Sequence, residues 1–512
     1  MKKRGFEFIE NKYRRMGICF FVYIVLIQPF SSNFLYSLDD YYLENIYVLD
    51  WENLGYNYYS YGRFAEGILA EIVSWLNLSP FNGIMAFSLW GMAVVLFANE
   101  IVDKWRVKNS VLNMVYMMLI MFNPFFVELY FYKNILGFSA FAVLSLWGGM
   151  KCIDEFWRGK KYIFLVTGGI CIIFSLSVYQ IFFPMIFMIY AVELFSVEKE
   201  KSLYKRIILN FVFAVFCLII YYMILNLVFW IKPTTVDSGM RLGLLFENLL
   251  LNKNNYWSTV AAQLKRFIFK DNMLSSGIVN LAIMLMCNLC ICFVFIKKIS
   301  LKDFSEIRKI LLAYAVFLIV QILGLLSCFG FSISNVMGTS SRSFTAWGIY
   351  SAGVLHVSEI FIKEMPTHFQ RKCLKMAVAA VMAVAFLTSA ARISRCASDI
   401  AKMNQIEESL VNRITARLEA YESFDPKNVK VYVHGYADLS KGYAKYFESF
   451  NHPAVGGFST IFAFSEITGY HFSSFSVEES KTALLCIPEM GKWPAANSIL
   501  ETDAGFIIKL GD

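Results

Sequence analysis

Charged side chains are scarce in this chain, at 17% against 57% hydrophobic residues, and the mean hydropathy is +0.53. A soluble protein must cover its surface with polar side chains, so this balance excludes a soluble globular fold. Apolar runs of about 17 to 25 residues, long enough to cross a bilayer core as helices, recur throughout. The sequence therefore predicts an all-α polytopic membrane protein of about 11 transmembrane helices. The expected spans lie near residues 17–35, 81–101, 111–129, 134–150, 162–178, 180–196, 207–230, 276–296, 310–330, 344–362 and 376–391.

Other scarce features narrow the function further. The five histidines are scattered, which disfavours a histidine metal site, and P-loop, GxGxxG and HExxH motifs are lacking. No internal repeat is visible. Most of the 11 cysteines fall inside expected spans, where cysteine behaves as a small apolar residue. Only Cys396 and Cys486 fall in the C-terminal segment, where one disulfide is an open alternative.

Lysine and arginine are distributed unevenly between alternate loops. The N-terminus and every second connection carry 26 of them, whereas the other four loops carry 9. Because basic short loops stay cytoplasmic, this alternation predicts a cytoplasmic N-terminus and an extracytoplasmic C-terminal segment, in the cytoplasmic (inner) membrane. The net charge of +8 is explained by loops that face anionic lipid headgroups, so nucleic acid is not an expected partner. The first apolar run is too long for a cleaved signal peptide and predicts a retained signal anchor.

The chain divides into two expected domains, a transmembrane domain at residues 1–392 and a small extracytoplasmic α/β domain at 393–512. Residues 400–418 have a helical pattern that Asp425 and Pro426 would stop. Strand-like "VKVYVHG", "TALLCIP" and "GFIIKL" follow. In the middle of the chain, "SVYQIFFP" leaves two spans almost no connection, so Pro184 marks either a turn or a kink.

The first outer loop, residues 36–80, is rich in acids and aromatic rings. Asp39 and Asp40 follow the first span directly, and the apolar positions of residues 64–76 predict an amphipathic helix on the membrane surface. The tyrosines between them suit either the headgroup layer or stacking on sugars. A carboxylate at the edge of the hydrocarbon is partly desolvated and becomes a better proton acceptor. The alternative is that Asp39 or Asp40 caps a helix.

Two arginines stand alone in their outer loops. Arg63 in "YGRF" is the only base of residues 36–80, and Arg342 in "GTSSRSF" is the only base of residues 331–343. A guanidinium binds phosphate with two parallel hydrogen bonds and stays charged, so either arginine is a candidate phosphate ligand. Either could equally be an anchor whose charged head reaches water.

Several short motifs, in their order along the chain, resemble a known family. "SLDDYY" after the first span, "YGRF" about twenty residues later, "SVYQIFFP" in mid-chain and a terminal "GFIIKLGD" together are similar to the Gtr-type glucosyltransferases of bacterial O-antigen conversion. These belong to the wider GT-C class of transferases that use polyprenyl-phosphate sugars. Each motif is short, and it is the order that carries the resemblance.

The resemblance implies an inverting transfer of a hexose, with glucose favoured, from a polyprenyl-phosphate donor to a surface-glycan hydroxyl such as that of O-antigen. By the same resemblance, one residue of the pair Asp39 and Asp40 takes the acceptor's proton, and we favour Asp40. Arg63, Tyr179 and Gln180 would shape the sugar or phosphate pocket, and Arg342 lies in the right loop for the leaving phosphate. Some proteins of this architecture use a divalent cation, and the sequence has no decisive ligand cluster for one. The alternatives are a transporter or flippase of a lipid-linked sugar, and a surface-polysaccharide polymerase.

Overall fold

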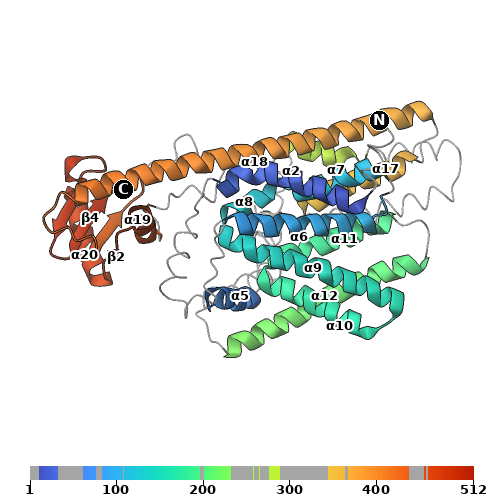
Figure 1. The fold of residues 1–512 in the computed structure, drawn as a ribbon, viewed down its shortest axis with the longest axis horizontal. Helices are drawn as coiled ribbons and strands as arrows, with labels where there is room; N and C mark the ends of the chain where they lie inside the picture. The colour runs from blue at the N-terminus through green and yellow to red at the C-terminus, as the bar shows by residue number, and fades with distance from the viewer. Residues whose placement is uncertain are drawn as a thin grey trace.

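The structure, a computed structural model, is a long helical bundle with a small sheet beyond one end (Figure 1). It describes residues 11–32, 62–75, 83–107, 109–196, 201–231, 258, 265, 276–286, 288, 344–363, 367–437, 455–456 and 459–511. The helices associated with the bundle are α2 (Lys12–Ser32), α5 (Phe64–Trp75), α6 (Gly83–Lys104), α7 (Ser110–Met121), α8 (Val127–Phe131), α9 (Lys133–Gly159), α10 (Tyr162–Val178), α11 (Phe183–Ser196), α12 (Lys201–Ile231), α17 (Trp347–Lys363) and α18 (His368–Leu418), with the 3-10 turns η1 (Pro124–Phe126) and η2 (Gln180–Phe182).

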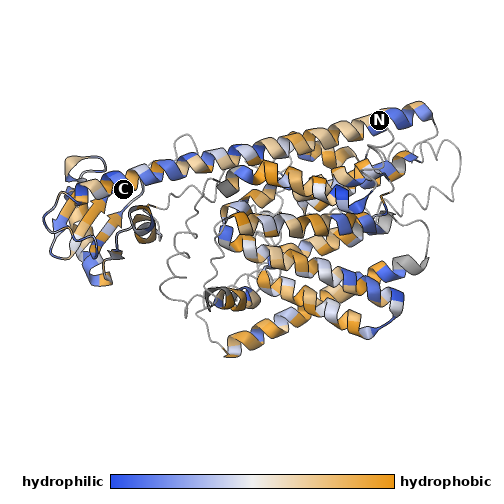
Figure 2. Ribbon diagram, in the orientation of Figure 1, coloured by the Kyte–Doolittle hydropathy of each residue, from blue (hydrophilic) through white to orange (hydrophobic). Residues whose placement is uncertain are grey.

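The bundle has the apolar exterior that contact with lipid requires. Outward-facing Val212, Phe216 and Met223 of α12 are each more than half exposed, and Figure 2 shows hydrophobic residues along the bundle helices. Five helices of the described residues are long and apolar enough to cross a membrane: Gly83–Lys104, Ser110–Phe131, Ile135–Gly159, Lys205–Ile231 and His368–Leu418. The expected run at residues 310–330 lies outside the described residues, so the count of eleven remains a prediction.

Close approach of glycines brings α9 and α10 together. A Cβ atom on Gly168 would lie 3.1 Å from the carbonyl oxygen of Gly149 and 3.0 Å from Cγ1 of Ile153. Small residues at such crossings let two backbones approach closely. Within a bilayer, where the hydrophobic effect does not drive helices together, van der Waals packing of this kind promotes their association. The pair α9 and α10 thus forms a tight hairpin beside α6 and α12.

The chain turns back at Tyr179, which ends α10. Its backbone N–H still bonds to the Ser175 carbonyl at 2.9 Å, but its φ of −156° and ψ of 110° are extended. Pro184 is the second residue of α11, where the missing N–H costs little because first-turn amides have no helical acceptor. Further along α11, the Ile189 carbonyl accepts a bond from the Trp105 indole at the far end of α6, at 3.3 Å. "SVYQIFFP" is therefore a turn between two helices and not a kink.

A small sheet follows α18. Its strands are β1 (Val429–His434), β2 (Phe472–Ser474), β3 (Ile499–Thr502) and β4 (Gly505–Lys509), in the order β2-β1-β4-β3, with only β3 and β4 antiparallel among the described pairs. Helices α19 (Thr460–Thr468) and α20 (Val477–Cys486) complete the described part of this C-terminal region. Ile414 and Leu418 of α18 are buried in the sheet's core with Val431 and Ile508. Because α18 runs unbroken through residue 392, the domain boundary expected there remains a prediction.

One segment expected as a strand is a helix. "VKVYVHG" and "GFIIKL" supply β1 and β4 as expected, but "TALLCIP" lies in α20 and the turn after it, so that prediction was wrong. A capping box starts α20, because Ser476 and Glu479 each bond to the other's backbone N–H, at 3.4 and 2.7 Å. The Lys430 hydrogen bond to Glu479, at 2.7 Å, with these cap bonds lowers the pKa of Glu479 to about 2. Cys396 and Cys486 are both free thiols, so the alternative of a disulfide is not realised.

Candidate functional site

The candidate site is built around a sharp turn in front of α5, at the end of the bundle nearer the sheet (Figure 1). We call this the α5 end. Gly62 has a φ of +73°, a left-handed conformation that side chains rarely adopt, so glycine is the residue this turn requires. Arg63 follows, and α5 starts at Phe64. The "GR" of "YGRF" is thus a turn that directs Arg63 inward.

Arg63 is buried between an acid and an aromatic ring. Its Nη1 lies 3.3 Å from Oε2 of Glu66, and both side chains are almost fully buried, at 7% and 1% exposure. Its Cζ lies 4.0 Å from the ring centroid of Tyr179, a distance at which a desolvated cation–π contact contributes about 2 kcal/mol. An anchor that reaches toward water would expose its head group. Arg63 has instead the environment of a held, desolvated cation.

The Gly62 carbonyl is held by two side chains from other helices. The Tyr221 hydroxyl of α12 donates to it at 2.8 Å, and the Gln180 amide Nε2 of η2 donates to it at 3.2 Å. The same Nε2 also donates to the Tyr221 oxygen at 2.7 Å. These three bonds close a triangle on the backbone immediately before Arg63. Gln180 and Tyr221 are 118 and 159 positions away from Gly62 in sequence, and both bond to its carbonyl.

A second set of hydrogen bonds continues from η2 across the α5 end. The Thr345 hydroxyl donates to the Ile181 carbonyl at 2.6 Å, next to Gln180. The Asn123 amide donates to the carbonyls of Phe344 and Thr345 at 3.1 and 2.9 Å, and its Oδ1 accepts from the Phe125 N–H at 3.2 Å. These side chains bond to backbone groups just after the ends of α7 and α10 and just before the start of α17. They thus satisfy polar backbone atoms that would otherwise be costly to bury.

Three of the six predicted site residues lie in the described part of the chain, and they meet. Arg63, Tyr179 and Gln180 come from segments far apart in sequence and share one site. Asp39, Asp40 and Arg342 lie outside the described residues. Arg342 is two positions before Phe344, which is the first described residue after residue 288.

Sequence reasoning missed Glu66 and Tyr221. The periodicity of the apolar positions in residues 64–76 leaves Glu66 on another face of the helix, whereas its side chain is buried against Arg63. Among the α5 side chains whose burial is described, Ile68 and Ile72 are half exposed. A helix is therefore confirmed here, whereas its place on the membrane surface remains a prediction. The spacing of Arg63 and Glu66, three residues apart in a helical first turn, is the signal that could have found this pair.

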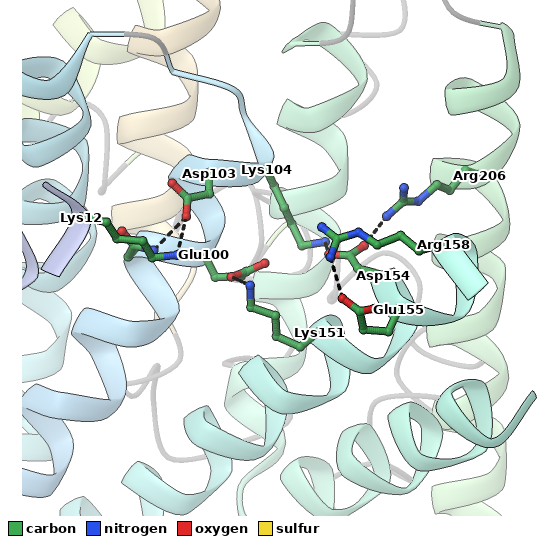
Figure 3. Close-up of polar contacts among 10 residues, drawn as sticks. Lys12, Glu100, Asp103, Lys104, Lys151, Asp154, Glu155, Arg158 and Arg206 are labelled. Atoms are coloured by element: carbon green, nitrogen blue, oxygen red, sulfur yellow. Dashed lines mark hydrogen bonds and ion pairs between the residues drawn. The ribbon is translucent and has the colours of Figure 1, made fainter. Parts of the chain in front are cut away.

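A different polar cluster lies at the opposite end of the bundle, which we call the Lys104 end (Figure 3). Asp154 of α9 pairs there with Lys104 of α6 and with Arg206 of α12. Its carboxylate joins three helices, which is a structural role. Within the ranges that the structure describes, no group of three or more histidines, cysteines and acids could hold a metal ion.

The apolar bundle and the polar site at one end of it define a helical membrane protein. The chain belongs to the glucosyl transferase GtrII family, whose family model matches residues 29–358, well over half of the chain. No curated protein and no solved structure matches it. The protein is therefore a glycosyltransferase that acts on a sugar donor and a glycan acceptor, with glucosyl transfer as the family activity. All six predicted site residues fall within the matched range, and the sheet falls outside it.

Proposed function

We propose that this glucosyltransferase moves a hexose, with glucose favoured, from a polyprenyl-phosphate donor to a hydroxyl of a cell-surface glycan such as O-antigen. The transfer inverts the anomeric centre and takes place on the outer side of the cytoplasmic membrane. The observation that supports this most is the buried Arg63, held by Glu66 and Tyr179 at one end of an apolar bundle. A lipid-linked donor would have its charged phosphate at the end of the bundle, where Arg63 lies, while its lipid tail lies in the hydrocarbon.

The energetics favour a binding role for Arg63 over a purely structural one. Burial of one ion costs several kcal/mol after relaxation, and a buried pair is often no more stable than apolar residues of the same size. The contact with Tyr179, worth about 2 kcal/mol, offsets only part of that cost. A role in binding an anionic substrate would account for the buried Arg63–Glu66 pair despite this cost. A guanidinium can form two parallel hydrogen bonds to phosphate oxygens.

The proposed reaction is a single displacement. Asp40 or Asp39 accepts the proton of the acceptor hydroxyl, and the hydroxyl oxygen forms a new bond to the anomeric carbon. The bond from that carbon to the phosphate oxygen breaks, and polyprenyl phosphate leaves with the bonding electrons. One carboxylate suffices, whereas a retaining glycosidase requires a second as nucleophile. The protein chiefly contributes position and charge stabilisation.

The other predicted residues take roles around Arg63. Tyr179 faces its guanidinium and Gln180 binds the carbonyl before it, so both would shape the phosphate pocket by holding Arg63. Arg342 would supply a second cation to the leaving phosphate. No step of the proposed reaction depends on a divalent cation.

The proposed orientation places the α5 end outside. Two observations support it: basic residues are concentrated in the loops expected on the cytoplasmic side, and Figure 1 draws the start of α2 and the sheet at opposite ends of the bundle. An odd number of spans, as expected from the sequence, gives the same arrangement.

The test uses membranes supplied with labelled polyprenyl-phosphate glucose and the acceptor glycan. We expect Asp40→Asn or Asp39→Asn, or both, to abolish transfer. We expect Arg63→Ala to reduce transfer at subsaturating donor at least 100-fold, because truncation of one partner of a buried, hydrogen-bonded charge pair costs about 2 to 5 kcal/mol. Glu155→Gln, an exposed acid at the Lys104 end, is the matched control and should transfer normally. Full activity of both aspartate variants would refute the base assignment, and no transfer from this donor by the native protein would refute the donor.

A further inference from the structure

Tyr221 contacts the chain on both sides of Arg63. Its hydroxyl donates to the carbonyl of Gly62, and its ring stacks on that of Phe64, with centroids 6.0 Å apart and planes 17° apart. Arg63 is the residue between them. The backbone that carries the guanidinium is thus fixed from α12, while the guanidinium itself is fixed by Tyr179 and Glu66.

Among the described contacts, the hydroxyl of Tyr221 bonds only to the Gly62 carbonyl and to Gln180. The ring is fully buried, and a buried hydroxyl without a partner costs about 1 to 3 kcal/mol in proteins. The two bonds that satisfy it are the one to the Gly62 carbonyl and the one from Gln180. A phenylalanine would fill the same space on an apolar helix, so packing by itself does not explain the oxygen.

We propose that Tyr221 is a positioning residue for donor-phosphate recognition. Its hydroxyl, together with Gln180, fixes the Gly62 carbonyl, and this orients the Arg63 guanidinium toward the donor phosphate. This rests on the proposed function, because it takes Arg63 as the phosphate ligand. The segment can be fixed in this way because the Gly62 turn has a left-handed φ and no side chain to separate it from Tyr221 and Gln180.

The first test compares Tyr221→Phe with Tyr222→Phe in the full-length protein reconstituted into lipid vesicles. Tyr222 is the next residue of α12, and its side chain is partly exposed, at 41%, which makes it the matched control. With polyprenyl-phosphate glucose as the probe, we expect Tyr221→Phe to raise the donor KM about tenfold, because a guanidinium that is no longer held in place loses part of its contact with the donor phosphate. The kcat and the melting temperature should change little, because Gln180 still binds Gly62 directly. An unchanged donor KM would overturn the proposal.

The second test asks whether Tyr221 acts through Arg63. Arg63→Lys keeps the charge but not the planar two-pronged geometry, so a hydroxyl that only orients the guanidinium has little left to orient. Tyr221→Phe should then change the donor KM less than twofold in the Arg63→Lys background. A tenfold change in both backgrounds would mean that the two residues act independently, and the proposal would fall. If Tyr221→Phe does not accumulate, Gln180→Leu carries the same prediction.

The outcomes separate this inference from the function on which it rests. Normal transfer by Arg63→Ala would remove the phosphate role of Arg63 whatever Tyr221 does. Loss of transfer by Arg63→Ala together with a native donor KM for Tyr221→Phe would remove only the role of Tyr221.

Discussion

Gly62 forms the left-handed turn that directly precedes Arg63. A Cβ atom there would lie 3.1 Å from the Tyr221 oxygen and 3.3 Å from Gln180 Nε2, at a φ of +73°. Left-handed backbone costs a side-chain-bearing residue about 1 to 2 kcal/mol, and the added methyl presses on the groups that bind the Gly62 carbonyl. Gly62→Ala should therefore lower transfer about tenfold or more, measured as initial rate at subsaturating donor.

Gly148→Ala is the matched control for that prediction. Gly148 lies within α9, and a Cβ atom there meets nothing within 4 Å. The control should keep native activity and, because alanine favours helices over glycine, native or slightly higher thermal stability. Native transfer rates for both alanine variants would show that the turn is not what aims Arg63.

At the residue scale, local motifs selected three residues that share one site, and the roles assigned to them remain predictions. Arg63, Tyr179 and Gln180 could be selected from "YGRF" and "SVYQIFFP", and the structure brings them together. Tyr221 could not be selected, because one tyrosine in the apolar run of α12 has the pattern of an ordinary core residue. Glu66 was misplaced for a related reason: hydropathy assigns a carboxylate to the polar face and takes no account of an arginine that turns inward three residues earlier.

Among the elements, α6, α9 and α12 are joined at the Lys104 end by Asp154, whose side chain is 11% exposed (Figure 3). Asp154→Asn would leave the cations of Lys104 and Arg206 without this carboxylate, and loss of one member of a buried pair typically costs about 3 to 5 kcal/mol. We expect a clear fall in the thermal unfolding temperature of the purified protein in detergent.

The neighbouring Glu155 is the control for Asp154. It pairs with Arg158 at 2.6 Å, but both side chains are well exposed, at 46% and 72%, and exposed pairs contribute about 0 to 1 kcal/mol. Glu155→Gln should leave the unfolding temperature nearly unchanged. Equal stability of the two variants would contradict a structural role for the Asp154 cluster.

At the scale of elements, long apolar runs predicted helices well and short apolar runs predicted poorly. The tight connection at Tyr179 was an open choice between a turn and a kink, because proline is compatible with both. "TALLCIP" was assigned to a strand by composition, whereas the Ser476 and Glu479 capping box before it starts a helix. Such local hydrogen bonds decide between elements when a run is too short for periodicity to do so.

At the scale of the whole molecule, α18 carries the chain from the bundle into the core of the sheet without a break. It is 51 residues long, and at about 1.5 Å per residue it exceeds twice the thickness of a bilayer core of about 30 Å. The sheet is therefore attached to a rigid element and not to a linker. It lies beyond the same end of the bundle as α5 (Figure 1), where an acceptor glycan would arrive in the proposed function.

This arrangement predicts which surfaces a water-soluble reagent reaches from outside the cell. Two single-cysteine variants, with the native cysteines replaced by serine, test it in spheroplasts with a membrane-impermeant maleimide. Glu478→Cys lies on α20 beside the sheet and Arg158→Cys lies at the Lys104 end, and the native side chains at these positions are 82% and 72% exposed. Because both sites are well exposed, a difference in labelling would come from the membrane. We expect Glu478→Cys to be labelled in intact spheroplasts and Arg158→Cys only after lysis; the reverse order would place the α5 end in the cytoplasm, where a surface glycan is not available as acceptor.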